Sequence, residues 1–474
     1  MRVRFGAMLA MAAMLSGCGG SDSGNVSTGG STPSPTPTAS AGCSLRERQD
    51  WAAAQLREWY LFPDTLPASL SPTPYTTVDD YIDALTATAR AQRKDRYFTY
   101  LTSIKDENAY YNSGSSAGFG FRLGIDSTNR LYVIESFEGA PALAAGLDRG
   151  TEIVAVGTTT SNLRTITAIM AAEGSAGLTT ALGPDTVGTS RVFQIADAAG
   201  TRTVTVAKSD FTLQPVSSRY GTQIIQDGGR SVGYVNLRTF ISTADPALRQ
   251  AFARFRAQGI TNVIVDLRYN GGGLVATAEL LSDLMGANRS TSEVVDYTTF
   301  RTEKAANNST RFFAPQPESI APTKIAFIGT GGTASASEFV INAFIPYLHA
   351  NAALIGTNTF GKPVGQIALD KPDCDDRLRV IAFATQNAAR QGAYFDGLAT
   401  KVEASCRAND DIGYPLGDPR EASTRQALDF LAGRSCTAIA GTASAQSART
   451  TVVRQDLLMS TAPSTAQRMV PGSF

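Results

Sequence analysis

Two side chains in this sequence, Ser335 and Lys362, could act together as a nucleophile and its base. A serine hydroxyl attacks a carbonyl carbon when a neighbouring group removes its proton, and a lysine can do so when burial lowers its pKa toward neutrality. A serine at the start of a helix is usually only a cap, and an isolated lysine is usually solvated. The pair is therefore more informative than either residue alone.

The only histidine, His349, argues against a serine-histidine-aspartate triad. On a continuous helix it would lie about 21 Å from Ser335, at roughly 1.5 Å per residue. Pro346 could end that helix earlier, but it would not obviously return His349 to the helix start. A lysine base is the alternative that the sequence offers.

A strand, a glycine-rich turn and a helix are expected to present Ser335. The apolar run 324–328 ends at Gly329, and apolar residues recur at helical spacing beyond Ala336. Thr333 or Ser335 could cap this helix with its hydroxyl. The sequence thus places Ser335 at the mouth of a helix.

A second strand is expected to bring Lys362 to the same place. The run 352–356 has the composition of a buried strand and precedes Lys362. If it lies parallel to the strand 324–328, the chain returns to the same end of the sheet. Lys362 would then lie near Ser335.

Three short runs around these residues resemble a family signature: SASE at 335–338, FGK at 360–362, and Gln366. They are similar to those of the C-terminal processing (tail-specific) peptidases, serine proteases with a Ser-Lys dyad. The resemblance implies that Ser335 is the nucleophile, Lys362 the general base, and Gln366 the group that orients the lysine. It implies no metal and no cofactor.

The sequence departs from the family pattern in two places. Thr333 stands where an additional serine is common, and the connection around Ile345 and Pro346 is slightly longer than expected. The second departure leaves Ser337 as a competing nucleophile. Neither departure changes the expected dyad.

The glycine-rich run at 268–273 resembles the family's Asp-Leu-Arg-Asn-x-x-Gly-Gly element, with Tyr269 between the arginine and the asparagine. The resemblance implies that a glycine amide, assigned to Gly272, and the amide of Ala336 form an oxyanion hole. Two preorganised N–H donors at such a place stabilise a tetrahedral intermediate.

Residues 118–208 resemble a PDZ module. Its carboxylate-binding loop would comprise Gly118, Phe119, Gly120 and Phe121. Such a module takes an extended peptide as an added strand, while loop amides hold the terminal carboxylate of the peptide. The alternative is a small β-rich domain without a ligand.

The expected fold class is α/β and multidomain, with a helical N-terminal region, a PDZ-like β-rich module and an α/β (ββα-type) catalytic core. Asp266 and Arg268 are expected to tie loops of this core together as an ion pair. The expected parts are a lipoprotein signal peptide over 1–18, a flexible linker over 19–42, an N-terminal helical domain over 43–114, a PDZ-like domain over 115–210, a serine peptidase catalytic domain over 211–436, and a loosely ordered, low-complexity C-terminal tail over 437–474.

The first residues predict export. Arg2 and Arg4 precede an apolar run over 5–15 that is too short for a membrane span, as in a signal peptide. The following Leu-Ser-Gly-Cys resembles a bacterial lipoprotein signal and implies that Cys18 is lipidated. An ordinary signal peptide with a chance cysteine is the alternative. The expected location is the bacterial cell envelope, on the periplasmic face or the outer membrane.

Four further cysteines, Cys43, Cys374, Cys406 and Cys436, suggest disulfides in an exported chain. Three connectivities are possible. We favour Cys374 with Cys406 and Cys43 with Cys436, because the second bond would join the two ends of the folded body.

Composition limits the function classes. The formal net charge is zero, charged residues make up 18%, and no basic cluster suggests nucleic-acid binding. The expected function is a lipid-anchored serine endopeptidase acting on peptides or proteins. The alternatives are a non-catalytic PDZ-type peptide-binding lipoprotein, and an esterase or amidase, although the Gly-x-Ser-x-Gly pattern is absent around Ser335.

Overall fold

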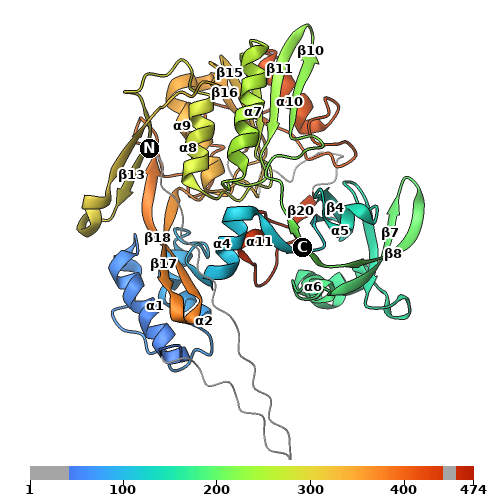
Figure 1. The fold of residues 1–474 in the computed structure, drawn as a ribbon, viewed down its shortest axis with the longest axis vertical. Coiled ribbons are helices and arrows are strands. Elements are labelled where there is room, and N and C mark those ends of the chain that lie inside the picture. The colour runs from blue at the N-terminus through green and yellow to red at the C-terminus, as the bar shows by residue number, and fades with distance from the viewer. Residues whose placement is uncertain (1–41, 441–454) are drawn as a thin grey trace, which may run out of the picture. The chain divides into compact units, whose positions relative to one another are not determined.

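The computed structural model describes residues 42–440 and 455–474 (Figure 1). These residues belong to one compact unit with three large β-sheets and one two-stranded sheet. The signal peptide expected over 1–18, the lipidation expected at Cys18 and nearly all of the linker expected over 19–42 lie outside the described residues. Within the described ranges, no helix is long and apolar enough to cross a membrane.

A six-stranded sheet forms the centre of the catalytic part. Its strands follow the order β10-β11-β12-β15-β16-β19, and all neighbours except β10 and β11 are parallel. Apolar runs such as NVIVD in β12 suit strands that are buried on both faces. The bounds are β10 Thr222–Asp227, β11 Arg230–Asn236, β12 Asn262–Asp266, β15 Lys324–Gly329, β16 Ala352–Gly356 and β19 Ala404–Arg407.

Helices cover both faces of this sheet. In β12, Val263 and Val265 join the core under α7, α8 and α9, whereas Ile264 packs in the core under α10. This alternation follows from the two-residue period of a strand. The mixed α/β fold predicted from the sequence is confirmed. The bounds are α7 Ala244–Ala257, α8 Val275–Leu284, α9 Ala336–Leu348 and α10 Ala422–Leu431.

A second sheet, entirely antiparallel, carries the N-terminal helices. Strands follow the order β1-β18-β13-β14, and β17 pairs with the same β18. Apolar residues of α1 and α2 pack against Leu378, Val380 and Ile381 of β18. The bounds are α1 Leu45–Trp59, α2 Val78–Leu85, α3 Ala87–Ala91, β1 Tyr100–Ser103, β13 Val294–Phe300, β14 Ser309–Phe312, β17 Val364–Lys371 and β18 Asp376–Gln386.

A third, seven-stranded sheet lies in the PDZ-like region. Its order is β20-β3-β4-β5-β7-β8, and β6 pairs with β5. Phe119, Phe121 and Phe193 form the centre of its core, together with apolar residues of α6. The bounds are β3 Phe121–Asp126, β4 Leu131–Ser136, α5 Pro141–Ala144, β5 Glu152–Gly157, β6 Arg164–Thr165, α6 Ile166–Leu182, β7 Ser190–Asp197, β8 Gly200–Ala207 and β20 Gln455–Leu457.

Shorter elements connect these sheets. The remaining helices and strands are α4 Ile104–Ser113, β2 Ser115–Gly118, β9 Ser209–Thr212 and α11 Thr465–Met469, and β2 pairs with β9. The 3₁₀ turns are η1 Pro63–Thr65, η2 Thr160–Asn162, η3 Thr302–Asn307, η4 His349–Asn351 and η5 Pro372–Cys374.

The disulfide pairing that we favoured is wrong. The bonds join Cys43 to Cys374 and Cys406 to Cys436, with Cα–Cα distances of 5.5 and 5.4 Å. Cys43 directly precedes α1, which packs on the β17–β18 hairpin whose turn contains Cys374. Cys436 follows α10 and lies beside β19, because the Cys406 side of that strand faces α10.

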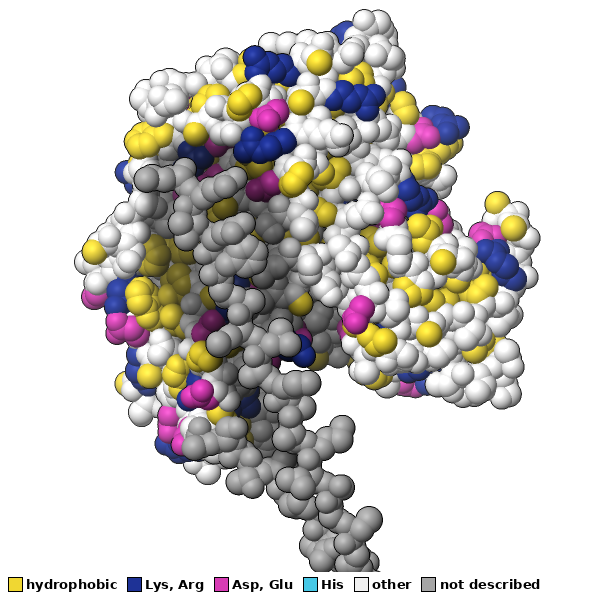
Figure 2. Space-filling model, in the orientation of Figure 1, with side chains coloured by type: hydrophobic (Ala, Val, Ile, Leu, Met, Phe, Trp, Pro, Cys, Tyr) yellow, Lys and Arg dark blue, Asp and Glu magenta, His cyan; other side chains and the backbone are white. Residues whose placement is uncertain are grey.

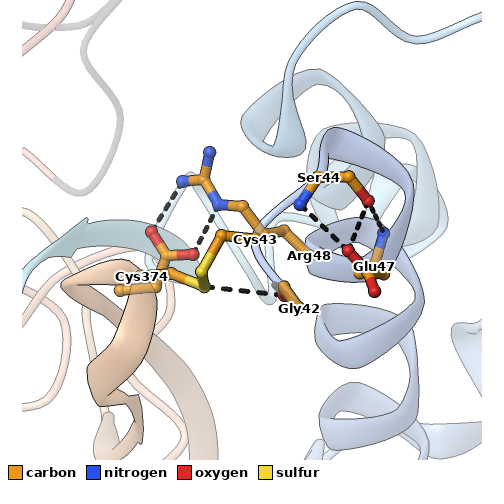
Figure 3. The surroundings of a disulfide bond; sticks show 7 residues. Gly42, Cys43, Ser44, Glu47, Arg48 and Cys374 are labelled. Carbon is orange, nitrogen blue, oxygen red and sulfur yellow. Dashed lines mark hydrogen bonds and ion pairs between the residues drawn. A yellow bond between two sulfur atoms is a disulfide. The ribbon is translucent and has the colours of Figure 1, made fainter. Parts of the chain in front are cut away.

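Local contacts reinforce the Cys43–Cys374 bond (Figure 3). Ser44 and Glu47 form a capping box that starts α1. Arg48, on the next turn, forms an ion pair with Asp376 beyond the disulfide, at 2.5 Å. The start of α1 is thus fixed covalently and electrostatically to the hairpin.

The expectation of a loosely ordered tail over 437–474 is wrong for residues 455–474. These residues form β20 and α11, and Leu458, Met469, Val470 and Phe474 are buried. Apolar contacts with the rest of the unit explain the difference, because composition alone does not show that the segment has a surface to pack against.

Charged side chains are interspersed on the face of the molecule shown in Figure 2. Lys and Arg side chains lie among Asp and Glu side chains there, in keeping with the zero net charge of the sequence.

We expect removal of the Cys43–Cys374 bond to destabilise the fold more than removal of the Cys406–Cys436 bond. The first closes a sequence separation of 331 and the second of 30, so chain entropy predicts a difference of about 2 kcal/mol in the free energy of unfolding. Urea unfolding of the two double alanine variants beside the parent measures it. Equal destabilisation by the two changes would contradict the prediction.

Candidate active site

Three loops meet at the carboxyl ends of three adjacent parallel strands. β12 leads into residues 268–273, β15 into residues 330–335, and β16 into residues 357–362. The carboxyl ends of parallel strands form one edge of a sheet, where ligands bind in α/β folds. The topology therefore places the expected oxyanion loop, the expected nucleophile and the expected base at one edge.

Ser335 is the residue directly before α9, with φ 57° and ψ −115°. A side chain other than glycine rarely adopts a positive φ, and such strain costs about 1 to 3 kcal/mol. The side chain is half-buried at a sharp turn between β15 and α9. Strain of this kind is common where a nucleophile is held on a strand-to-helix turn.

The carboxylate of Glu338 joins the Ser335 loop to the Lys362 loop. Its Oε2 accepts the backbone N–H of Ser335 at 3.1 Å and that of Lys362 at 2.7 Å. Its Oε1 accepts the N–H of Gly361 at 2.7 Å and the hydroxyl of Thr359 at 2.6 Å. Burial raises the pKa of Glu338, and these four donors act in the opposite direction.

Lys362 is held in an apolar environment. Its side chain is 7% exposed, its Nζ donates to Oε1 of Gln366 at 2.8 Å, and it lies 4.9 Å from the ring centre of Phe98. Burial lowers the pKa of Lys362 to about 8. A fraction of neutral amine is thus present near physiological pH, as a general base requires.

Arg96 and Phe98, which precede the PDZ-like module in the sequence, complete the surroundings of Lys362. Gln366 donates its amide to the carbonyl of Phe98, which fixes the orientation of its Oε1 toward the lysine. Arg96 donates to the carbonyl of Gly361 at 2.8 Å and lies over the ring of Phe360 at 4.0 Å. No sequence pattern indicated these contacts, because they join residues more than 260 positions apart.

Gly272 lies against the expected nucleophile. A Cβ placed on Gly272 would lie 2.7 Å from the Cβ of Ser335 and 3.1 Å from the amide nitrogen of Ala336, so only glycine fits. In this conformation its N–H donates to Oδ1 of Asn270 at 2.9 Å. The structure thus brings Gly272 and Ala336 together, with the Gly272 donor already engaged.

Two other candidates from the sequence have structural partners instead. Ser337 is buried, and its hydroxyl donates to the carbonyl of Asn270 at 3.0 Å. His349 lies at the other end of α9 from Ser335, and its exposed ring is 2.8 Å from Glu403. The geometry favours neither as a nucleophile or a base acting with Ser335.

The expected ion pair of Asp266 and Arg268 is confirmed, with a distance of 2.9 Å. Arg268 also pairs with Glu421 at 2.9 Å and with Asp410 at 3.0 Å. These buried pairs anchor the start of the 268–273 loop to the segment before α10.

The four residues of the expected carboxylate-binding loop lie at the junction of β2 and β3. Phe119 and Phe121 are buried and their ring centres are 5.4 Å apart. The N–H of Gly120 donates to the backbone oxygen of Phe474 at 2.9 Å. Gly118 lies against the same residue, because a Cβ there would be 2.9 Å from the Phe474 carbonyl carbon.

A cavity of about 990 Å³ lies beside the loops that carry Gly271, Ala334 and Lys362. Its lining includes Phe98, Lys362, Ala334 and Gly271, together with residues 456–457 and 459–463. In the described ranges, no group of three or more His, Cys, Asp or Glu side chains is arranged to hold a metal ion.

Comparison with known proteins identifies relatives of this chain. The model of peptidase family S41 matches residues 231–392. A carboxyl-terminal-processing protease of Picosynechococcus is 28% identical over 263 residues, which is 55% of this chain and 58% of the relative. The chloroplastic C-terminal processing peptidase of Tetradesmus obliquus is 27% identical over 274 residues, which is 55% of this chain and 54% of the relative. The chain thus covers little more than half of these curated relatives.

The fold is shared with a solved structure. The crystal structure of a putative S41 protease from Bacteroides fragilis superposes with a TM-score of 0.62 at 20% identity, covering 85% of this chain and 99% of that one. The loops 268–273, 330–335 and 357–362 all lie within residues 231–392, the stretch that the family model matches. Residues 231–392 therefore match peptidase family S41, and the chain is similar to C-terminal processing proteases over about half of its length.

Proposed function

We propose that this chain is a serine endopeptidase of the C-terminal processing type, with Ser335 as nucleophile and Lys362 as general base. The observation that carries the proposal is the buried lysine, with its lowered pKa and its hydrogen bond to Gln366, next to the loop of a strained serine. The shared acceptor Glu338 holds the two backbone segments side by side. The substrate class is peptides or proteins.

The reaction follows from these positions. The neutral amine of Lys362 takes the proton of the Ser335 hydroxyl as the oxygen attacks the scissile carbonyl, and then returns it to the leaving amine. The N–H groups of Ala336 and Gly272 would stabilise the oxyanion. Gly272 must exchange its bond to Asn270 for one to the substrate, which makes hole formation part of the catalytic cycle.

The PDZ-like module is the proposed peptide-presenting part, through the loop of Gly118, Phe119, Gly120 and Phe121. Its support is the edge of β3, where β20 pairs as an added strand in this structure. Peptide binding without catalysis is the less favoured function, because binding alone does not require a buried lysine such as Lys362, whose side chain is only 7% exposed.

The proposed location is the bacterial cell envelope, with a lipid anchor at Cys18. Two disulfides fit an oxidising compartment outside the cytoplasm. The anchor rests on the sequence of residues 1–18 alone.

Alanine at Ser335 or at Lys362 should each lower the cleavage rate of an unstructured protein such as casein at least about a thousandfold, because the dyad acts as a unit. The release of labelled fragments measures the rate, and circular dichroism verifies folding. The matched controls are His349→Ala and Lys401→Ala, both at exposed positions, and they should retain the parent rate. Folded Ser335→Ala or Lys362→Ala protein with parent activity would refute the assignment.

The rate should rise with pH through about 8. Burial lowers the pKa of Lys362 to about 8, so the amine is protonated below this value and cannot accept the serine proton. We expect kcat/KM to fall about tenfold per pH unit below 7. Lys362→Arg should be inactive throughout, because arginine stays protonated. A rate that is flat from pH 6 to 9 would exclude Lys362 as the base.

Alanine at Glu338 should lower the free energy of unfolding by about 3 kcal/mol or more and abolish cleavage, since it leaves buried donors of both catalytic loops, including the amides of Ser335 and Lys362, without an acceptor. Glu403→Ala is the control, because that exposed carboxylate pairs with the exposed ring of His349 and should contribute less than about 1 kcal/mol. Urea unfolding measures both. Similar values for the two variants would contradict the role of Glu338.

A further inference from the structure

The edge of the PDZ-like sheet is occupied by residues 455–474, here called the docked segment. β20 pairs antiparallel with β3, where Leu457 lies opposite Gly124. Further along β3, the N–H of Leu123 donates to the carbonyl of Gly472 at 2.9 Å. Both ends of the docked segment thus add to the same strand edge, where a peptide ligand would add.

Phe474 occupies the expected ligand position. Its N–H donates to the carbonyl of Phe121 at 3.0 Å, and its backbone oxygen accepts the N–H of Gly120 at 2.9 Å. Its side chain is 5% exposed and packs in the core that contains Phe119 and Ile166. The docked segment therefore supplies both the backbone pairing and the buried anchor of a bound peptide.

The middle of the docked segment lies against the catalytic loops. The carbonyl of Met469 accepts the N–H of Gly271 at 2.9 Å. A Cβ placed on Gly332 would lie 3.0 Å from Cδ1 of Leu457. α11 also contacts α4, and Figure 1 shows these two helices next to each other. The segment therefore reaches the loops on either side of the expected active site.

One buried side chain contacts both the docked segment and the oxyanion loop. Arg122 of β3 is 1% exposed and is paired with Glu135. Its Nε donates to the carbonyl of Pro471 at 2.9 Å, and its second guanidinium nitrogen donates to the carbonyl of Tyr269 at 3.4 Å. The state of the groove is thus linked physically to the 268–273 loop.

We propose that residues 455–474 are an intramolecular ligand of the peptide groove, which excludes external peptides until it is displaced. One strand edge pairs with one peptide at a time, and a tethered ligand acts at a high effective concentration. The docked segment also indicates the ligand class: an extended peptide with an aromatic residue in the position of Phe474, preceded by small residues as at Gly472 and Ser473. The effect on cleavage rests on the proposed function, whereas the binding does not.

Peptide binding tests the proposal without any need for catalysis. A fluorescein-labelled peptide, TAQRMVPGSF, reproduces residues 465–474, and the Ser335→Ala background prevents its cleavage. Fluorescence anisotropy compares the full chain with a chain truncated after residue 454. We expect the truncated chain to bind at least about tenfold more tightly, because its groove is empty. Equal affinity of the two chains, or no binding by a folded truncated chain, would overturn the proposal.

Point variants guard against loss of folding on truncation. Phe474→Ala in the full chain removes only the buried anchor and should raise peptide affinity toward that of the truncated chain. Phe312→Ala is the matched control, since it is the same substitution at a side chain of β14 that is 43% exposed, and it should bind peptide as weakly as the parent. A Phe474→Ala affinity equal to that of Phe312→Ala would overturn the proposal.

Cleavage of casein, with Ser335 intact, separates this inference from the proposed function. Truncation and Phe474→Ala should each raise kcat/KM, and added free peptide should reverse the gain for the truncated chain. If no chain cleaves casein, the proposed function fails, and the binding comparison still decides the inference. If the chains cleave at equal rates, the docked segment does not exclude substrate and the inference fails.

Discussion

The buried carboxylate of Glu338 is the contact on which the candidate site depends. It lies in the first turn of α9, and it accepts backbone N–H groups from the turn before that helix and from the loop after β16. A positive φ at Ser335 is unfavourable by itself, and the hydrogen bond from the Ser335 N–H offsets part of this cost. The same acceptor fixes the backbone of Lys362. A single side chain thereby joins the backbone of Ser335, the proposed nucleophile, to that of Lys362, the proposed base.

The environment of Lys362, the proposed base, also depends on residues far away in the sequence. The pKa of Lys362 falls because Phe98 and its neighbours exclude water, and Gln366 keeps its orientation through the carbonyl of Phe98. That region is in turn packed on β18 and joined to the β17–β18 hairpin by the Cys43–Cys374 bond. The N-terminal helices are therefore part of the environment that lowers the pKa of Lys362.

Local patterns were sufficient for the elements that present the site. The strand, turn and helix around Ser335 follow from an apolar run, glycines and helical spacing, which are properties of neighbouring residues. The disulfide pairing failed because it depends on which distant segments pack together. The prediction of a loosely ordered tail failed for residues 455–474 for the same reason. The Ala, Ser and Thr content of this segment suggests disorder, whereas its order depends on the apolar contacts that Leu458 and Phe474 make in the groove beside β3.

In the loop 268–273, two backbone N–H groups are engaged in hydrogen bonds within the protein. Gly271 donates its N–H to Met469 of the docked segment, and Gly272 donates its N–H to Asn270. Neither amide is available to a substrate carbonyl while these bonds persist. A peptide that displaces residues 455–474 from β3 also removes the acceptor of Gly271 and the Pro471 contact of Arg122. Because Arg122 also donates to the Tyr269 carbonyl, ligand exchange in the groove would act on a contact of the 268–273 loop, which carries the proposed oxyanion-hole donor Gly272.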